Sequence, residues 1–502
     1  SALKNELYLG QKFSESELVI GLVGAVGTEL KQVIDILSDR LKVGFRYTAE
    51  EVRVSSDIIP RIVKLPDTNG DEFKRITLRM DAGDEARRVS GDNSVLALGV
   101  AAKIAERRPT EGDQAKNRPR YAYIINSLKH PEEVTRLREI YPEGFYLIGV
   151  HCDTKRRHDY LVRGKRLPSQ QAEQLMQRDE DEHVPHGQQT SETFHLSDFF
   201  VRIDGNQDKL KNSLWRVLDI LFGHPHTTPT FDEYAMFQAF SAALRSADLS
   251  RQVGAVVAQE QEREIIASGA NDCPKSGGGL YWPEYDESSS EIKDAPSGRD
   301  YMRGEDANKV EQQKIIEDIL SKLEEGADRE KLVAALKKSR LMDITEYGRM
   351  VHAEMEALLA CARNRASTRG ATLYCTTFPC HNCAKHIIAA GMKRVVYIEP
   401  YPKSKAAEFH SDAISLGFSE SKDTVHFEPF VGVGPRRFFD LFSMRLGSGY
   451  PLRRKEKAGQ AVEWKPEESR LRIQMLPCSY LELEILASSM FDNFCRKQGA
   501  HA

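Results

Sequence analysis

A stretch in the second half of the chain concentrates residues that bind metals. Cys380 and Cys383 are three positions apart and directly follow Pro379. Proline is favourable at the first position of a helix, and residues i and i+3 of a helix lie on one face. Both sulfur atoms are therefore expected to reach one metal ion. His352 offers an imidazole as a third ligand, and Glu354 offers a carboxylate two residues later.

Three protein ligands leave the fourth position of a tetrahedral ion to water, which is the arrangement of catalytic zinc sites. The order His-x-Glu and then Pro-Cys-x-x-Cys is the signature of zinc deaminases, whose glutamate is a general acid and base. We therefore predict His352, Cys380 and Cys383 as ligands of Zn²⁺ and Glu354 as the catalytic residue. A structural zinc knuckle is the alternative, but it requires a fourth Cys or His nearby and leaves Glu354 unexplained.

The composition indicates a globular protein of a reducing compartment. Eight cysteines in 502 residues are too few for a disulfide scaffold, which favours a cytoplasmic location. No apolar run is long enough to span a bilayer, so we expect no membrane contact. The 71 basic and 75 acidic residues give a net charge of −4, which argues against a chain-wide surface for nucleic acid.

The length and the residue patterns predict an α/β protein of two domains and an extension. Apolar runs at 18–23, 121–125 and 145–150 alternate with helical patterns, which is typical of a parallel sheet. We place the first domain at 1–225, the second at 226–450 and a C-terminal extension that packs on the second domain at 451–502. Residues 276–345 are predicted to be an insertion, either a lid or oligomer arm or a solvated helical hairpin with one buried stripe.

Several segments resemble deoxycytidylate deaminases of the cytidine deaminase superfamily. They are "RSADLSRQVGAVVA", "IIASGANDCP", "HAEMEALLACA" and "GATLYCTTFPCHNCAKHIIAAGMKRVVYIEPY". The first half resembles nucleoside monophosphate kinases with a P-loop. Together the two parts are similar to the bacterial anti-phage dCTP deaminases.

This resemblance implies a P-loop kinase-like parallel-sheet domain followed by a cytidine-deaminase-like α/β/α domain with a five-stranded mixed sheet. It implies hydrolysis of dCTP, and of dCMP too, to dUTP or dUMP plus ammonia, which depletes cytosine deoxynucleotides during phage infection. Asn271 corresponds to the family's sugar-contacting asparagine, and this match makes us prefer the ligand role to the alternative, an Asx turn before Pro274. A homo-oligomer, a nucleotide effector and an inhibitory small non-coding RNA are further partners that the resemblance implies.

Phosphate groups require fixed cations or backbone amides. The cations placed nearest to the predicted site are Arg245, Arg251, Lys403 and Lys405, and each of them alone is as readily a solvated surface charge.

"GLVGAVGTELK" resembles a phosphate-binding loop, with Gly24, Gly27 and Thr28 as candidate nucleotide-binding residues. The G-x-x-x-x-G-K-[ST] pattern fails, because Leu30 and Lys31 stand at its last two places. We therefore prefer a regulatory or degenerate nucleotide site to phosphoryl transfer, and a purely structural α/β domain is the alternative.

Two rival functions follow from the same residues. A deaminase that edits polynucleotides requires a basic channel and stacking aromatic residues, whereas this chain is acidic with 8% aromatic residues. A protein of another class would be a switch, in which an RNA or a nucleotide bound by the kinase-like domain controls the deaminase.

Overall fold

The computed structural model describes residues 15–112, 114–181, 186–322, 328–399, 404–417, 423–475 and 477–498. The chain divides into two compact units, the first formed by Ser1–Glu233 with Val431–Ala502 and the second by Tyr234–Phe430. The boundary between Glu233 and Tyr234 lies close to the predicted boundary at residue 225. The second unit ends at residue 430 and not at 450, because the chain then returns to the first unit.

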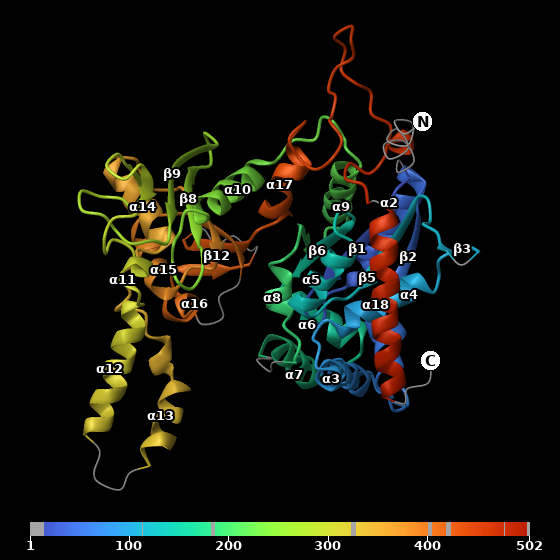
Figure 1. Cartoon of the computed structure of the whole chain (residues 1–502), viewed down its shortest axis with the longest axis horizontal. Helices are drawn as coiled ribbons and strands as arrows, with labels where there is room; N and C mark the ends of the chain where they lie inside the picture. The colour runs from blue at the N-terminus through green and yellow to red at the C-terminus, as the bar shows by residue number, and fades with distance from the viewer. Residues whose placement is uncertain are drawn as a thin grey trace. The chain divides into compact units, whose positions relative to one another are not determined.

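A sheet of six described strands, in the order β16-β7-β6-β1-β5-β2, forms the centre of the first unit (Figure 1). Five strands are parallel, and the short strand β16 is antiparallel to β7. The strands are β1 Leu18–Val23, β2 Thr48–Arg53, β5 Tyr121–Asn126, β6 Phe145–Cys152, β7 Phe199–Ile203 and β16 Gly432–Val433. The predicted apolar runs are thus strands of a parallel sheet, and the relationship to kinases stays a prediction.

Both faces of this sheet are covered by helices, which explains why β1 is apolar throughout. Side chains of a strand alternate between the two faces. Leu18, Ile20 and Leu22 pack towards α2 (Leu30–Phe45) and α9 (Gln207–Leu221). Val19 and Val23 belong to the opposite core with α4 (Val95–Ala105), α5 (Pro131–Ile140) and α18 (Pro477–Lys497). None of the described helices is long and apolar enough to cross a membrane.

The C-terminal helix α18 packs against α4 of the first unit and not on the deaminase-like domain, which corrects the prediction for 451–502 (Figure 1). The buried residues of its described part are Tyr480, Ala487, Phe491 and Cys495, together with Glu484. The apolar stretch around Leu481, Leu483 and Ile485 led to the prediction. Leu481 is partly buried against the core of the first unit, whereas Leu483 and Ile485 are 38% and 55% exposed.

A buried group of charged and phenolic side chains fixes α18 to the sheet. Arg108 Nη1 lies 2.9 Å from Glu17 Oε2, and its Nη2 donates to Glu484 Oε1 over 3.0 Å. Tyr141 donates to Glu484 over 2.6 Å, and Tyr480 donates to Glu17. The side chains of the three charged residues are at most 1% exposed. Each buried charge therefore depends on its partners for the solvation that it loses on folding.

Glu484→Ala is expected to destabilise the first unit, because removing one partner of a buried ion pair costs about 3–5 kcal/mol. Glu482→Ala, on the exposed side of the same helix, is expected to change the free energy of unfolding by less than about 0.5 kcal/mol. Urea denaturation followed by tryptophan fluorescence measures both, since Trp215 and Trp464 lie in this unit. Equal effects of the two substitutions would contradict the role given to the buried group.

The second unit is built on a mixed sheet in the order β14-β15-β13-β12-β8-β9. Its described strands are β8 Gly254–Gln259, β9 Glu264–Ala270, β12 Thr372–Thr377, β13 Arg394–Glu399, β14 Ile414–Leu416 and β15 Val425–Pro429. The strands β12, β13, β15 and β14 are parallel, whereas β8 is antiparallel to both of its neighbours. The sheet has one strand more than the resemblance implied, the three-residue β14.

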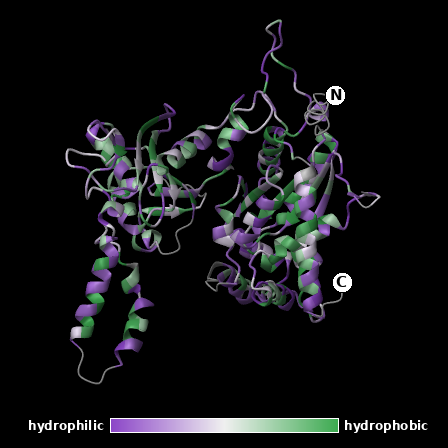
Figure 2. Cartoon of the chain, in the orientation of Figure 1, coloured by the Kyte–Doolittle hydropathy of each residue, from purple (hydrophilic) through white to green (hydrophobic). Residues whose placement is uncertain are grey.

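The predicted insertion at 276–345 contains a small hairpin and a pair of helices (Figure 1). Its elements are β10 Glu284–Asp286, β11 Glu291–Lys293, α11 Asp300–Arg303, α12 Ala307–Ser321 and α13 Arg329–Lys337. Figure 2 shows apolar and polar residues mixed along both longer helices. The expected apolar stripe comprises Ile315, Ile316, Ile319, Leu323, Leu332, Val333 and Leu336. Of its described residues only Ile316 is buried, and α13 buries no residue. Leu323 lies outside the described residues.

Candidate metal centre and substrate cavity

His352 is the residue that caps the N-terminus of α14 (Ala353–Arg363). The segment before it is tied to the end of β9, because Val351 N–H donates to Asp272 O over 3.0 Å and Asp272 N–H donates back over 3.3 Å. The helix also lies directly on the strand: a Cβ on Gly269 would be 2.3 Å from Ala353 O. The glycine therefore sets how closely α14, and with it His352, approaches the sheet.

Cys380 caps the N-terminus of the second helix, α15 (His381–Ala389), and Cys383 lies in its first turn. The Cys380 sulfur accepts the N–H of Cys383 over 3.4 Å. Pro379 thus precedes the cap and is not the first helical residue, which corrects the predicted local geometry. The two sulfur atoms still face the same point, because the cap residue and the third residue after it lie on one side of the helix terminus.

The three predicted ligand atoms converge. His352 Nδ1 is 3.4 Å from the Sγ of Cys380 and 3.4 Å from the Sγ of Cys383, and all three atoms lie within 4.8 Å of one another. Tetrahedral zinc with bonds of about 2.1 Å to nitrogen and 2.3 Å to sulfur requires an N···S separation of about 3.6 Å. The donor set and its spacing therefore fit one zinc ion with three protein ligands.

The position of these ligands at helix N-termini favours the thiolate that a metal requires. A hydrogen bond with Cys383 lowers the pKa of the Cys380 thiol to about 3. The hydrogen bond with Cys380 raises the pKa of His352 to about 9. The hydrogen bond between the two cysteines raises the pKa of the Cys383 thiol well above its usual value, so the negative charge is favoured on the Cys380 sulfur.

Glu354 lies in the first turn of α14, only 4% exposed, and is not part of the ligand cluster. Burial raises the pKa of its carboxyl. A carboxyl group beside the ligands but outside their cluster has the position of a group that exchanges protons with a bound molecule.

The cluster opens into a cavity of about 710 Å³, which lies wholly in the second unit. His352, Glu354 and Cys380 line it together with two of the predicted phosphate contacts, Arg251 and Lys405. This volume is in the range of small-molecule sites. Further lining residues come from other parts of the unit and include Asp248, Ser250, Asn271, Asp306, Asn308, Arg340, Thr345, Phe378, His381, Glu408 and Phe409.

The insertion supplies part of this cavity wall, through Asp306, Asn308, Arg340 and Thr345. No local motif marks these residues, and sequence reasoning missed them because only the tertiary fold brings them to the metal centre. This part of the insertion forms cavity wall, and the lid interpretation stays a prediction.

The insertion is held at its base by buried ion pairs. Arg299 lies 3.2 Å from Asp272 Oδ2 and 3.0 Å from Asp294 Oδ2, and Arg349 lies 2.5 Å from Asp300 Oδ1. Asp272 directly follows Asn271 in sequence. The same residues that position the start of α14 therefore also position the insertion.

Asn271 lines the cavity, but its amide is already engaged with the backbone. Its Oδ1 accepts from Val253 N–H over 2.7 Å, and its Nδ2 donates to Arg251 O over 2.9 Å. An amide has two donors and two acceptor positions, so one of each remains for a ligand. The sugar contact stays a prediction, next to a structural role that the geometry shows directly.

The other predicted phosphate contacts differ in their outcome. Arg245 is not among the residues that line the cavity: it donates to Tyr281 O over 2.6 Å and lies 3.6 Å from the centre of the Trp282 ring. Stacking on this ring explains its orientation, which the prediction did not anticipate. Lys405 pairs with Glu408 at 2.6 Å. Lys403 lies outside the described residues.

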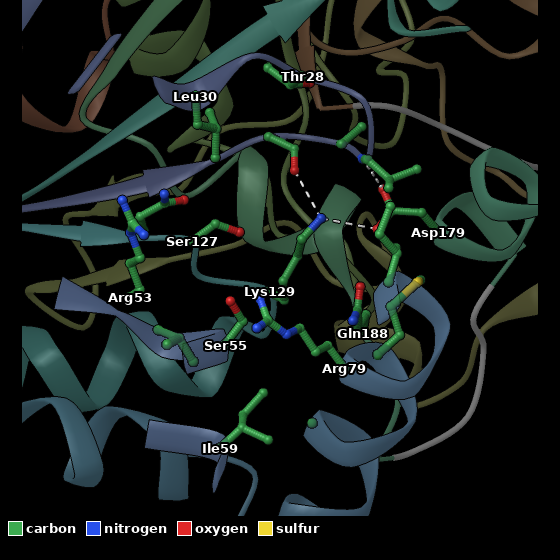
Figure 3. Close-up of a pocket in the computed structure, with 18 of the residues that line it drawn as sticks. Thr28, Leu30, Arg53, Ser55, Ile59, Arg79, Ser127, Lys129, Asp179 and Gln188 are labelled. Atoms are coloured by element: carbon green, nitrogen blue, oxygen red, sulfur yellow. Dashed lines mark hydrogen bonds and ion pairs between the residues drawn. The ribbon is translucent and has the colours of Figure 1, made fainter. Parts of the chain in front are cut away.

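Gly24, Gly27 and Thr28 come together in the lining of a different cavity, in the first unit (Figure 3). Gly27 has a φ of +86°, and a Cβ there would lie 2.8 Å from Arg157 O. The glycine is therefore required for the shape of this loop.

Residues 229–399 match the family model described as "Cytidine and deoxycytidylate deaminase zinc-binding region". This segment is therefore similar to the zinc-binding region of these deaminases. Zinc is accordingly the metal of the centre whose three donor atoms converge there.

Relatives of the deaminase region include the deoxycytidylate deaminase of Enterobacteria phage T2, 51% identical over 55 residues that cover 11% of this chain and 29% of the relative. The deoxycytidylate deaminase of Saccharomyces cerevisiae is 26% identical over 294 residues, 56% of this chain and 76% of the relative. The chain thus spans under a third of the phage relative's length. Among solved structures, the dCMP deaminase of cyanophage S-TIM5 aligns with 41% of this chain and 100% of its own, at 18% identity and a TM-score of 0.23.

Cys380→Ser is expected to abolish stoichiometric zinc binding, because it replaces a soft thiolate ligand with a hydroxyl. Cys152→Ser is the matched control, since Cys152 lies in the first unit. Metal analysis of the purified variants by inductively coupled plasma mass spectrometry should find about one zinc per chain only in the control. One zinc per chain in Cys380→Ser would remove Cys380 from the ligand set.

Proposed function

We propose that the chain is a zinc-dependent hydrolase that converts dCTP and dCMP to dUTP and dUMP with release of ammonia. The observation that carries this proposal is the convergence of one imidazole and two thiols beside a buried glutamate that is not a ligand. The matched deaminase family supports the reaction class, and the deoxycytidylate deaminases among the relatives support a deoxynucleotide substrate.

His352, Cys380 and Cys383 are the residues that would hold the zinc, which supplies an activated water when bound. Glu354 lies in the same cavity and is the group that would take a proton from the water and deliver it to the N3 atom of the ring. It would then return a proton to the leaving amino group at C4. Water is added and ammonia leaves, so the reaction needs no other reactant.

The walls of the cavity suit a nucleotide more than a free base. Phe378 and Phe409 provide apolar surface, while Arg251, Arg340 and Lys405 provide positive charge. Asp248, Asp306 and Glu408 line the same cavity, and this mixture of charges disfavours the continuous negative charge of a polynucleotide. We therefore prefer a free nucleotide to single-stranded DNA or RNA as the substrate.

Glu354→Gln is expected to keep zinc and to lower the rate of ammonia release from dCMP and dCTP by about 10²–10⁴-fold, because the amide cannot exchange the proton. Glu346→Gln, on an exposed residue outside the cavity lining, should keep normal turnover. A coupled ammonia assay with dCTP, dCMP, CTP and single-stranded DNA measures both variants and the substrate preference. Normal turnover in Glu354→Gln would refute the role of this residue.

Arg340→Ala is expected to raise the KM for dCMP and dCTP more than the KM for deoxycytidine, since a charged hydrogen bond to phosphate contributes about 1.5–3 kcal/mol. Arg329→Ala, on the exposed helix α13, should leave all three values unchanged. Steady-state kinetics with the three substrates decides the question. An equal rise for the nucleoside and the nucleotides would exclude Arg340 from the phosphate site.

We further propose an antiviral role, in which the chain depletes cytosine deoxynucleotides when a phage infects the cell. The resemblance to anti-phage dCTP deaminases supports it, and the first unit would be available for control by a nucleotide or a small RNA. We also propose a homo-oligomeric assembly on the same ground. Measurement of dCTP in infected cells, with the wild-type chain and with Glu354→Gln, tests the antiviral role: equal dCTP levels in the two would refute it.

A further inference from the structure

The first unit contains a cavity of about 540 Å³ that the deaminase reaction does not use. The loop after β1, helix α3 (Glu72–Ser90), Lys129 and helix α7 (Ser169–Asp181) contribute to its wall. Seven basic and three acidic side chains are among the described residues that line it. The excess of positive charge favours an anionic ligand.

A carboxylate already occupies the anion-binding part of the loop (Figure 3). Asp179 Oδ2 accepts the N–H of Val26 over 2.8 Å, and its Oδ1 lies 3.0 Å from Lys129 Nζ and 3.3 Å from Thr190 Oγ1. The side chain of Asp179 is 1% exposed. Backbone N–H groups and an ammonium group are the donors that phosphate-binding loops offer to phosphate oxygens. The contacts of Asp179 are thus those of a phosphate at this loop.

Lys129 provides the charge that the loop sequence lacks. The lysine nearest to the motif position, Lys31, pairs with Asp35 at 2.7 Å and its side chain is 60% exposed. Lys129 follows β5 in the sequence, and its Nζ donates to Gly24 O over 2.9 Å, at the start of the loop. Lys129 is 105 positions from Gly24 in the sequence. It thus brings to the loop the positive charge that the lysine of the motif would provide.

Arg79 brings a positive charge that forms no ion pair with a described carboxylate, although the charge of Glu72 acts on it from a distance. In the described part of the chain its side chain makes no hydrogen bond or ion pair, whereas Arg75 pairs with Glu72 and Arg53 pairs with Glu51. Burial, and then the charges of Arg75 and Arg53, lower the pKa of Arg79. Figure 3 shows it among the residues that line the cavity. A bound anion would compensate this charge.

The cavity also has an apolar part. Ile59, Ile76, Met80 and Leu96 line it, and Figure 3 shows Ile59 on the side opposite to Thr28, with Lys129 and Arg79 between them. Apolar walls with a few convergent polar groups are typical of sites for small molecules, and the volume suits a nucleotide. Inorganic phosphate alone would leave this part of the cavity unused.

We propose that this cavity binds a phosphorylated nucleoside, whose phosphate replaces the Asp179 carboxylate at Val26 N–H and Lys129 and is held further by Arg79. The nucleoside lies on the apolar wall beside Ile59. All of these residues belong to the first unit, so the proposal does not depend on the deaminase assignment.

Isothermal titration calorimetry of the full zinc-loaded chain tests this site with the diphosphates of adenosine, guanosine, uridine and thymidine, and with pyrophosphate. Cytosine nucleotides are left out because the proposed deaminase cavity binds them. At least one nucleoside diphosphate is expected to bind saturably and more tightly than pyrophosphate. Arg79→Gln should weaken that binding by at least about tenfold, the effect of losing one charged hydrogen bond.

Lys74→Gln is the matched control, an exposed cation on the same helix that does not line the cavity, and it should bind normally. Asp179→Asn should bind more tightly than the wild-type chain, because the competing charge is gone. Thermal unfolding confirms that each variant is folded, and Arg79→Gln removes no described contact. The proposal is overturned if no diphosphate binds, if pyrophosphate binds as tightly, if Arg79→Gln binds normally, or if folded Asp179→Asn binds more weakly.

Discussion

The second unit depends on the meeting of two helix N-termini at one point. His352 precedes α14 and Cys380 precedes α15, and the third ligand follows in the first turn of α15. Each helix terminus presents free N–H groups and partial positive charge, and at α15 these favour negative charge on the Cys380 sulfur together with the imidazole of His352. The metal centre therefore depends on how α14 and α15 are placed on the sheet, and small displacements of either helix would separate the donor atoms.

Much of the surrounding structure serves to fix these two helices. Gly269 allows α14 to lie on the backbone of β9, and the paired N–H and C=O groups of Asp272 and Val351 hold the residue just before His352. Arg299 connects Asp272 to the insertion through buried ion pairs. Buried ion pairs are costly to separate. We therefore expect a displacement of the insertion base to displace the metal ligand His352 as well.

The sequence predicted what depends on local order. The ligands, the acid beside them and the strands of the parallel sheet are set by spacing and by hydrophobic runs. The cavity wall from the insertion, including Arg340, depends on contacts between residues far apart in sequence and has no local pattern. The same limit explains why the packing of α18 was predicted wrongly. Its buried face carries Glu484, which a search for hydrophobic patterns counts as polar. Arg245 is the opposite case. Its position in the sequence suggested a phosphate contact, but its side chain stacks on the ring of Trp282.

The phosphate-loop motif is a further example: the loop itself lacks the motif's lysine, whereas Lys129, from another segment, donates to Gly24 O at the start of the loop. Failure of a motif therefore excludes a particular residue and not the chemistry of the site. In both units the segment after a strand stabilises a negative charge. After β12 this charge is on the Cys380 sulfur, and after β1 it is on the Asp179 carboxylate, which accepts from Val26 N–H.

X-ray absorption at the zinc edge on the purified chain tests the central claim most directly. The structure predicts one zinc with two sulfur neighbours at about 2.3 Å and the remaining nitrogen or oxygen neighbours at about 2.0–2.1 Å, one of which exchanges when a nucleotide analogue is added. A centre with three or four sulfur neighbours, or a spectrum that no ligand changes, would contradict the account.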